Sequence, residues 1–292
     1  MKFHQISKFT LKNHLHFASM NFQNPSKYLI NLITGSGIVC LALICSKQDV
    51  ALANCSQEFG TNPSSMNDSC EITPDRYVIK IYEMGFCTSD PLASSDFSGS
   101  TCTATFQSEN GKEINIAGTT VSLSDGSATR PAPGSYEHAY IKMSNTFGLR
   151  GTYLMNDTTF CSSGDGSATS ATGCTGTNFN ETLIDFSRGG TCNGTTSDQE
   201  FSVSVPFNTG VTGTMKAKLT NNNYVTSTSC GSSTRLVGSF EPTNPITISN
   251  TTQGLEVDFT VTNTGMTIVP NGGGNGISSF GSGPFRPRFS SY

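Results

Sequence analysis

The stretch RPAPGSYEHAYIKMSNTFGLRG, residues 130–151, places a Pro/Gly turn directly before a regular alternation of side chains. Pro133 and Gly134 favour the turn. Because side chains of a strand alternate between two faces, every second residue after the turn shares a face. Three of them form an apolar face that is expected to lie on the core: Ala139, Ile141 and Met143. The stretch therefore predicts a β-strand buried on one side.

The other face of this strand carries a row of larger polar residues, which are Tyr136, His138, Tyr140 and Lys142. The row is expected to point outward, or toward a loop laid over the sheet, and is a candidate surface binding row. An ordinary strand face explains the same pattern, so both interpretations stay open. His138 is the only histidine after residue 53, so the row is also the place for a switch near neutral pH.

Alternation of the same kind recurs on both sides of this stretch. RYVIKIYEMGFC, residues 76–87, is typical of an interior strand because both of its faces are rich in strand-forming residues. CTATFQS and KEINIAG are joined by the residues 109–111, Glu-Asn-Gly, and an Asn-Gly turn between two such runs predicts a hairpin. EFSVSVPF, GTMKAKLT and LEVDFTVTNTGMTIV add further strands.

Many short strands and no helical periodicity predict an all-β fold, an antiparallel β-sandwich. One elaborated sandwich over residues 54–269 is favoured over two small ones. Residues 158–198 are rich in Cys, Ser, Thr and Gly and are expected to form a disulfide-stapled, loop-rich excursion. Residues 270–292 are expected to be a flexible Gly/Ser-rich tail.

The N-terminal region has the three-part layout of a secretory signal peptide. Lysines precede an uncharged apolar run at residues 29–45, and Ala51 and Ala53 supply small residues for cleavage after Ala53. The alternative is an uncleaved membrane anchor, which needs about 20 apolar residues and is interrupted here by polar ones. A lipid anchor on Cys55 is disfavoured because Asn54 replaces the small residue that such a motif requires.

The charge of the mature chain restricts its partners. Removing residues 1–53 takes five lysines and one aspartate from 17 basic and 21 acidic residues, leaving 12 and 20 and a formal charge of −8. An acidic surface disfavours nucleic acid and anionic membranes. The expected partner, although not identified, is a protein or glycan at the cell surface, with membrane contact only in transit through the signal peptide.

Eight of the ten cysteines follow residue 53, and they are Cys55, Cys70, Cys87, Cys102, Cys161, Cys174, Cys192 and Cys230. An even number, an exported chain and the lack of zinc-ligand spacing predict four disulfides. Many connectivities are possible. Sequential pairing is favoured because each early pair brackets a turn-rich segment, giving Cys55–Cys70, Cys87–Cys102, Cys161–Cys174 and Cys192–Cys230.

The residues that catalysis requires are scarce. Ser-His-Asp and Cys-His sites need an imidazole, and His138 lies in the middle of a predicted strand with no G-x-S-x-G nearby. The Asp- and Asn-rich loops lack the spacing of an EF-hand, and the chain contains no Trp to form a sugar platform. The chain is therefore expected to be no enzyme, with no catalytic residue, cofactor or metal.

The stretch PAPGSYEHAYIKMSNTFGLRG, residues 131–151, resembles the strand-entry motif of transthyretin-like and carboxypeptidase-regulatory-like β-sandwich modules. The stretch RYVIKIYEMGFC, residues 76–87, resembles the first strand of uncharacterised exported proteins of marine bacteria and cyanobacteria. The resemblance implies a sandwich on an exported protein, mediating contact or presentation, and it implies no ligand residues.

These observations favour an exported, disulfide-stabilised, non-enzymatic β-sandwich protein. Its expected role is structural or adhesive, at the cell surface, in the envelope or periplasm, or after secretion. Two alternatives stay open. One is a secreted hydrolase or carbohydrate-binding protein that uses acidic loop residues. The other is a virion surface protein.

Overall fold

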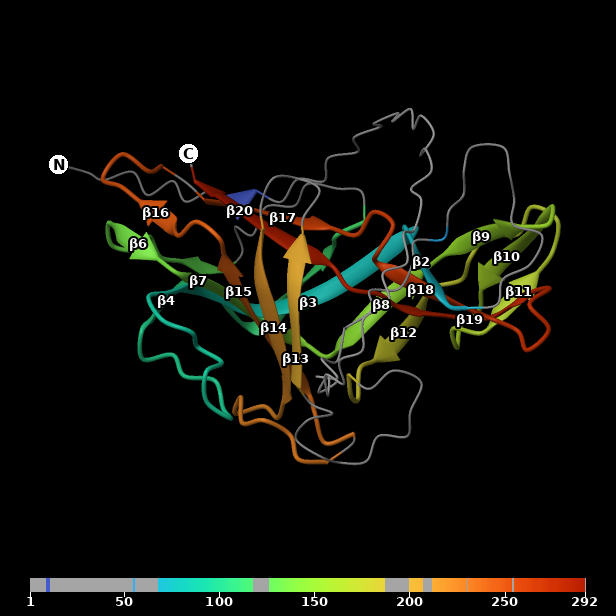
Figure 1. The fold of residues 1–292 in the computed structure, drawn as a ribbon, viewed down its shortest axis with the longest axis horizontal. Helices are drawn as coiled ribbons and strands as arrows, with labels where there is room; N and C mark the ends of the chain where they lie inside the picture. The colour runs from blue at the N-terminus through green and yellow to red at the C-terminus, as the bar shows by residue number, and fades with distance from the viewer. Residues whose placement is uncertain are drawn as a thin grey trace, which may run out of the picture. The chain divides into compact units, whose positions relative to one another are not determined.

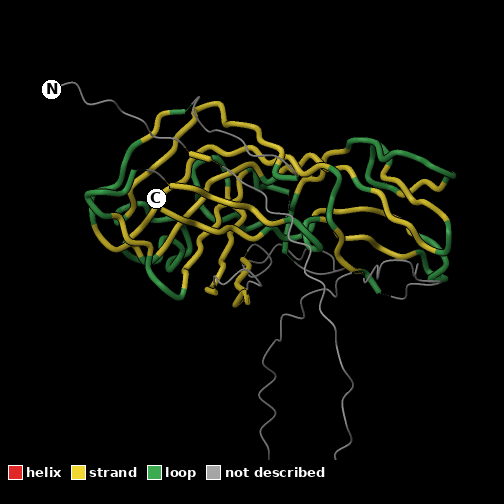
Figure 2. Tube along the Cα trace, turned by 90° about the horizontal axis from the view of Figure 1, so that it is seen from above, coloured by secondary structure: helices red, strands yellow, loops and turns green. Residues whose placement is uncertain are grey.

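The structure is a computed structural model that describes residues 9–10, 55, 68–117, 126–186, 200–206, 212–229, 231–253 and 255–291. Their regular elements are all β-strands, and none is a helix (Figure 2). The strand pairs of these residues are antiparallel, except for β1 with β17. The prediction of an all-β, antiparallel sandwich is therefore confirmed. The apolar run and cleavage point of the predicted signal peptide lie outside the described residues.

Nine strands of the described residues form the main sheet. They are β3 (Arg76–Cys87), β4 (Cys102–Asn115), β5 (Ser127–Ala128), β7 (His138–Ser144), β8 (Thr146–Arg150), β12 (Phe179–Thr182), β13 (Glu200–Pro206), β14 (Thr212–Thr220) and β15 (Arg235–Pro242).

The long strand β3 crosses the centre of the described strands (Figure 1). Met84 of β3 pairs with Phe106 of β4 and with Ile141 of β7, so β4 and β7 lie on opposite edges of β3. β8 continues β7 along the same edge, where it pairs with residues 76–78. β15, β14 and β13 follow on the outer side of β7, and β12 follows on the outer side of β8.

Smaller sheets complete the described part. They contain β1 (Phe9–Thr10), β17 (Leu255–Thr260) and β20 (Arg286–Ser291); β2 (Cys70–Ile72), β18 (Met266–Pro270) and β19 (Ile277–Ser282); β9 (Thr152–Met155), β10 (Thr158–Ser162) and β11 (Ala168–Ser170); and β6 (Gly134–Tyr136) with β16 (Ile246–Ile248). The described ranges contain no helical segment that could span a membrane.

The core is formed by the apolar side chains that alternate along the strands. Ile79 and Ile81 of β3 are fully buried on one face of the main sheet. They belong to one continuous cluster with Phe259 of β17 and Ile268 of β18. Burial of each large apolar side chain contributes about 1.5–3 kcal/mol, so packing between sheets is the main stabilising interaction of the fold.

Three disulfides join the described cysteines, in the sequential order that the spacing favours. They are Cys55–Cys70, Cys87–Cys102 and Cys161–Cys174. The fourth expected pair, Cys192–Cys230, lies outside the described residues. The third bond lies in the predicted excursion, where β10 and β11 form a hairpin and β12 adds an outer strand beside β8.

The hairpin predicted around Asn110 and Gly111 is wrong. The two runs that flank this turn both pair with β3, with Gln107 opposite Glu83 and Lys112 opposite Ile81. The four residues between them therefore bulge from one long strand, and Gly111 adopts a left-handed φ of 74° there. β3 is long enough to pair with both runs, so they lie end to end along it.

The flexible tail predicted for residues 270–292 is also wrong. β19 pairs with β18, and β20 pairs with β17. Ile277 and Phe280 are only 6% and 4% exposed and belong to the core. Although the segment is rich in glycine, it contains a few apolar side chains at strand spacing. These are sufficient to pack the segment against the core.

Candidate functional site

The polar row predicted on one strand divides between two elements. His138, Tyr140 and Lys142 do share one face of β7. Tyr136 instead belongs to β6, which pairs with β16, and its ring packs 5.9 Å from that of Phe86 in the core. The bend at Glu137 separates the two strands, so the alternation does not continue from Tyr136 to His138.

The face of the main sheet that carries Tyr140, Lys142, Lys216 and Lys218 is here named the lysine face. Residues 88–101, the covering loop, lie over part of it. The ring of Phe97 in this loop lies 5.2 Å from that of Tyr140.

The covering loop buries the predicted surface row. His138, Tyr140 and Lys142 are 6%, 3% and 8% exposed. The row is therefore no surface binding row, and of the two expected orientations it has the one toward a loop laid over the sheet. Alternation states which side chains share a face, but it does not state whether another segment covers that face.

The Cys87–Cys102 disulfide joins the two ends of the covering loop. These cysteines are also a cross-strand pair of β3 and β4, with Cα atoms 4.0 Å apart. The two cysteines are 15 positions apart in the sequence, so the bond closes a short loop. Such a closure stabilises the fold by about 3 kcal/mol in the chain-entropy model.

Lys142 is held between a carboxylate and two aromatic rings. Its Nζ lies 2.9 Å from Oε1 of Glu83, and 4.2 and 4.3 Å from the ring centres of Phe97 and Tyr224. A cation over an aromatic face is attracted by the ring quadrupole. Phe97 lies in the covering loop, so the buried charge of Lys142 helps to hold that loop against the sheet.

Glu83 stays ionised in this setting. Burial by itself raises the pKa of its carboxyl, but hydrogen bonds from Lys142 and Tyr140 lower it below its ordinary value overall. The hydroxyl of Tyr140 donates to Glu83 Oε1 over 2.7 Å. Burial and this bond to a carboxylate raise the pKa of Tyr140 far above its ordinary value. The tyrosine therefore stays protonated near neutral pH and acts as a hydrogen-bond donor to Glu83.

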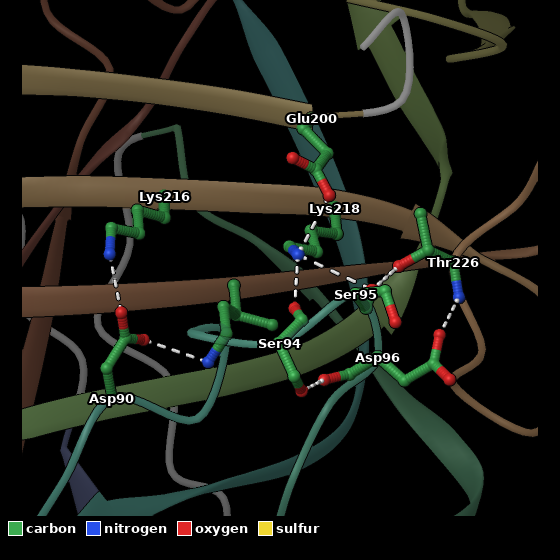
Figure 3. Close-up of polar contacts among 9 residues, drawn as sticks. Asp90, Ser94, Ser95, Asp96, Glu200, Lys216, Lys218 and Thr226 are labelled. Carbon is green, nitrogen blue, oxygen red and sulfur yellow. Dashed lines mark hydrogen bonds and ion pairs between the residues drawn. The ribbon is translucent and has the colours of Figure 1, made fainter. Parts of the chain in front are cut away.

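Two lysines of β14 bind the covering loop directly (Figure 3). Nζ of Lys216 lies 2.5 Å from Oδ2 of Asp90. Nζ of Lys218 donates to the main-chain oxygens of Ser94, at 2.5 Å, and Ser95, at 3.4 Å. Burial raises the pKa of Asp90, but hydrogen bonds from Lys216 and a main-chain amide lower it overall.

Further contacts complete this arrangement. Lys218 Nζ also pairs with Oε1 of Glu200 on β13, at 2.8 Å. The amide of Thr226 donates to Oδ1 of Asp96 over 3.0 Å, and the Thr226 hydroxyl donates to the main-chain oxygen of Ser95 (Figure 3). The loop is thus fixed at both ends and along its length.

The covering loop presents a small polar surface to solvent. Leu92 is 3% exposed and anchors the loop, whereas residues 93–95 and 98–101 are exposed and are mainly Ser and Thr, with Gly and Ala. Their hydroxyls and main-chain groups can donate and accept hydrogen bonds. The three lysines beneath are engaged in the contacts above, so the charge of this site is largely neutralised within the protein.

Chemistry at His138 is restricted by its surroundings. It is buried, and its Nδ1 has no hydrogen-bond partner among the described residues. No group of three or more His, Cys, Asp or Glu within the described ranges is arranged to hold a metal ion. What this arrangement does is hold a loop in one conformation.

Lys216, Lys218 and Asp90 were not singled out by the sequence analysis. The alternation in GTMKAKLT does place the two lysines on one face of β14, opposite its apolar residues. Their partners in the covering loop, however, lie more than 120 positions away in the sequence. No local pattern could identify that pairing.

No protein-family model, no curated protein and no solved structure matches this chain. The resemblance to transthyretin-like modules therefore stays a prediction.

Proposed function

We propose that the chain is an exported, non-enzymatic β-sandwich protein with a structural or adhesive role at the cell surface or envelope, and that the covering loop is its contact element. One observation carries the proposal: the loop is closed by the Cys87–Cys102 disulfide and bound along its length by Lys216 and Lys218.

A loop that is fixed before binding loses little conformational entropy when it meets a partner. Binding residues are commonly found on loops that a rigid scaffold positions. The exposed hydroxyls of residues 93–95 and 98–101 suit a partner that presents polar groups, such as a protein surface or a glycan.

Export is supported by the cysteines. Disulfides form and persist in oxidising compartments and are rare in the cytosol. The bonds Cys55–Cys70, Cys87–Cys102 and Cys161–Cys174 all close short loops, as in proteins that must survive outside the cell.

The location is tested by fractionating producing cells and analysing the protein by mass spectrometry without reduction. We expect the protein in the envelope or the medium, with the three disulfides intact. Recovery in the cytosol with free thiols at these positions would refute export.

The contact role is tested with protein-coated beads and producing cells. Ser100→Arg changes an exposed loop position and should reduce bead attachment, because it places a long charged side chain on the contact surface. Ser170→Arg makes the same change at an exposed residue of β11 and serves as the matched control. Equal attachment of both variants and the unmodified protein would exclude the loop as the contact element.

A further inference from the structure

The core face of the main sheet, opposite the lysine face, contains an apolar cavity of about 320 Å³. Its walls include Met84, Ile141, Met215 and Phe240 from the sheet. Phe259 and residues 284–285 line its other side. Protein interiors pack as densely as organic crystals, with few voids larger than a water molecule. A cavity of this size is therefore a specific feature of the fold.

Two small residues account for the hollow. Gly238 of β15 and Ala217 of β14 are a cross-strand pair on the core face. A Cβ atom on Gly238 would meet Cγ2 of Ile141 at 3.1 Å and the main-chain oxygen of Lys216 at 4.0 Å, so the space beside this position is otherwise open. Larger side chains at this pair would fill the space between the sheet and Phe259.

The cavity is elongated. Its lining comes from β3, β7, β15 and β14, which are four neighbouring strands of the main sheet. Three spacings between strands amount to about 14 Å. The aromatic rings of Tyr77, Phe147 and Phe285 lie within 6.5 Å of one another in pairs and form one end. Met215, Ala217 and Gly238 are partly exposed and mark the other end as the opening.

The described lining residues disfavour an anionic head group. Lys216 carries the positive charge among the described lining residues, and its Nζ is held by Asp90 on the lysine face. Glu71 and Asp185 add negative charge. Met84, Met143 and Met215 supply flexible apolar walls, which adapt well to chains without fixed shape.

We propose that this cavity binds one linear hydrocarbon chain of an amphiphile whose head group has no net charge, the head lying at the opening beside β14. Apolar cavities stay dry and take up apolar molecules; an engineered one of roughly 150 Å³ binds benzene. The cavity here is larger and elongated, which favours a chain over a compact ring. The proposal is independent of the role of the covering loop.

The experiment is isothermal titration of the purified protein with 1-decanol, compared with 1-adamantanol and decanoate. We expect saturable binding of one decanol per chain. Adamantanol is compact and decanoate is charged, so the affinity for each should be lower than that for decanol by about tenfold or more. Absence of saturable decanol binding, or equal affinity for adamantanol, would overturn the proposal.

Variants place the ligand in the cavity. Ala217→Phe should weaken decanol binding by about tenfold or more, because one misplaced methylene already changes affinity in an apolar pocket to that extent. Thr214→Phe adds the same ring to β14 on the lysine face and should bind as the unmodified protein does. Unchanged affinity of Ala217→Phe would contradict the assignment. If this variant does not fold, Ala217→Leu and the rise in melting temperature of the unmodified protein with decanol decide the question.

The source of the chain is resolved by sedimentation with phosphatidylcholine vesicles. Binding to vesicles that Ala217→Phe abolishes identifies a membrane lipid as the source. Binding of decanol without vesicle binding identifies a free amphiphile. Vesicle binding that Ala217→Phe leaves unchanged would show that the cavity does not hold the lipid chain.

Discussion

Asn145 lies where the main sheet divides, between β7 and β8. β7 and β8 continue one another on a single edge of β3, but their outer neighbours, β15 and β12, diverge at this residue. The Asn145 side chain is 3% exposed, and its Nδ2 donates to the main-chain oxygens of Leu183, at 2.9 Å, and Ser233, at 3.0 Å. One amide group therefore satisfies two carbonyls where the ladders separate.

Replacing Asn145 by Ala should lower the free energy of unfolding by about 2–3 kcal/mol, because two hydrogen bonds are lost and two carbonyls lose a partner. Urea unfolding measures the change. Asn180→Ala, at an exposed position of β12, is the control and should stay within about 0.5 kcal/mol. A similar effect of both substitutions would mean that the Asn145 amide does not join the two strands.

The carboxyl of Glu83 should make stability depend on pH. The pKa of this carboxyl is lower in the folded protein than its ordinary value of 4.5. The carboxylate therefore contributes fully to folding stability above pH 4.5, and this contribution is lost as the pH falls through the folded pKa. Glu83→Gln should reduce stability near neutral pH and flatten the loss of stability between about pH 5 and 3. Thermal unfolding across this range tests this, and Glu113→Gln, at an exposed position, should keep the unmodified profile.

At the level of elements, the covering loop depends on β14, a strand with which it shares no ladder. Lys216→Ala and Lys218→Ala should each loosen the loop, because each removes a charged contact to residues 90–95. A loss of about 1 kcal/mol from the free energy of local opening corresponds to a roughly fivefold larger population of the open loop. Hydrogen exchange of residues 88–101 measures this opening.

The matched control for the loop is Lys80→Ala on β3, where the ammonium lies 6.0 Å from the Tyr82 ring centre, a weaker contact. It should leave hydrogen exchange of residues 88–101 unchanged. Exchange that responds equally to all three substitutions would show that net charge, and not the contacts of β14, governs the loop.

At the scale of the whole molecule, the C-terminal segment closes the core. Phe280→Ala should lower the free energy of unfolding by roughly 3–5 kcal/mol, the usual cost of deleting a buried aromatic side chain. Phe280 is 4% exposed, whereas Val269 is 38% exposed, so Val269→Ala should have a much smaller effect. Calorimetric melting of the two variants distinguishes a docked segment from a flexible tail, since a tail would tolerate Phe280→Ala.

Local patterns predicted much of the fold. Alternation identified the core face of β7, because backbone geometry sets the direction of neighbouring side chains. The pairs Cys87–Cys102 and Cys161–Cys174 are close in sequence, so the turn-rich segments that they bracket indicated them. The candidate site was predicted only in part, since His138, Tyr140 and Lys142 were identified but not what covers them.

Local sequence is enough to predict the strand class, the two faces of β7 and the sequential order of the described disulfides, because these depend on neighbours within a few residues or one short loop. Long-range packing determines that residues 88–101 cover the lysine face, that both halves of β4 pair with β3, and that residues 277–282 and 286–291 form strands. Each of these outcomes is a competition among distant segments for the same edge or face. The arrangement of lowest free energy buries the most apolar surface while satisfying buried polar groups. It depends on the whole chain and cannot be predicted from one segment.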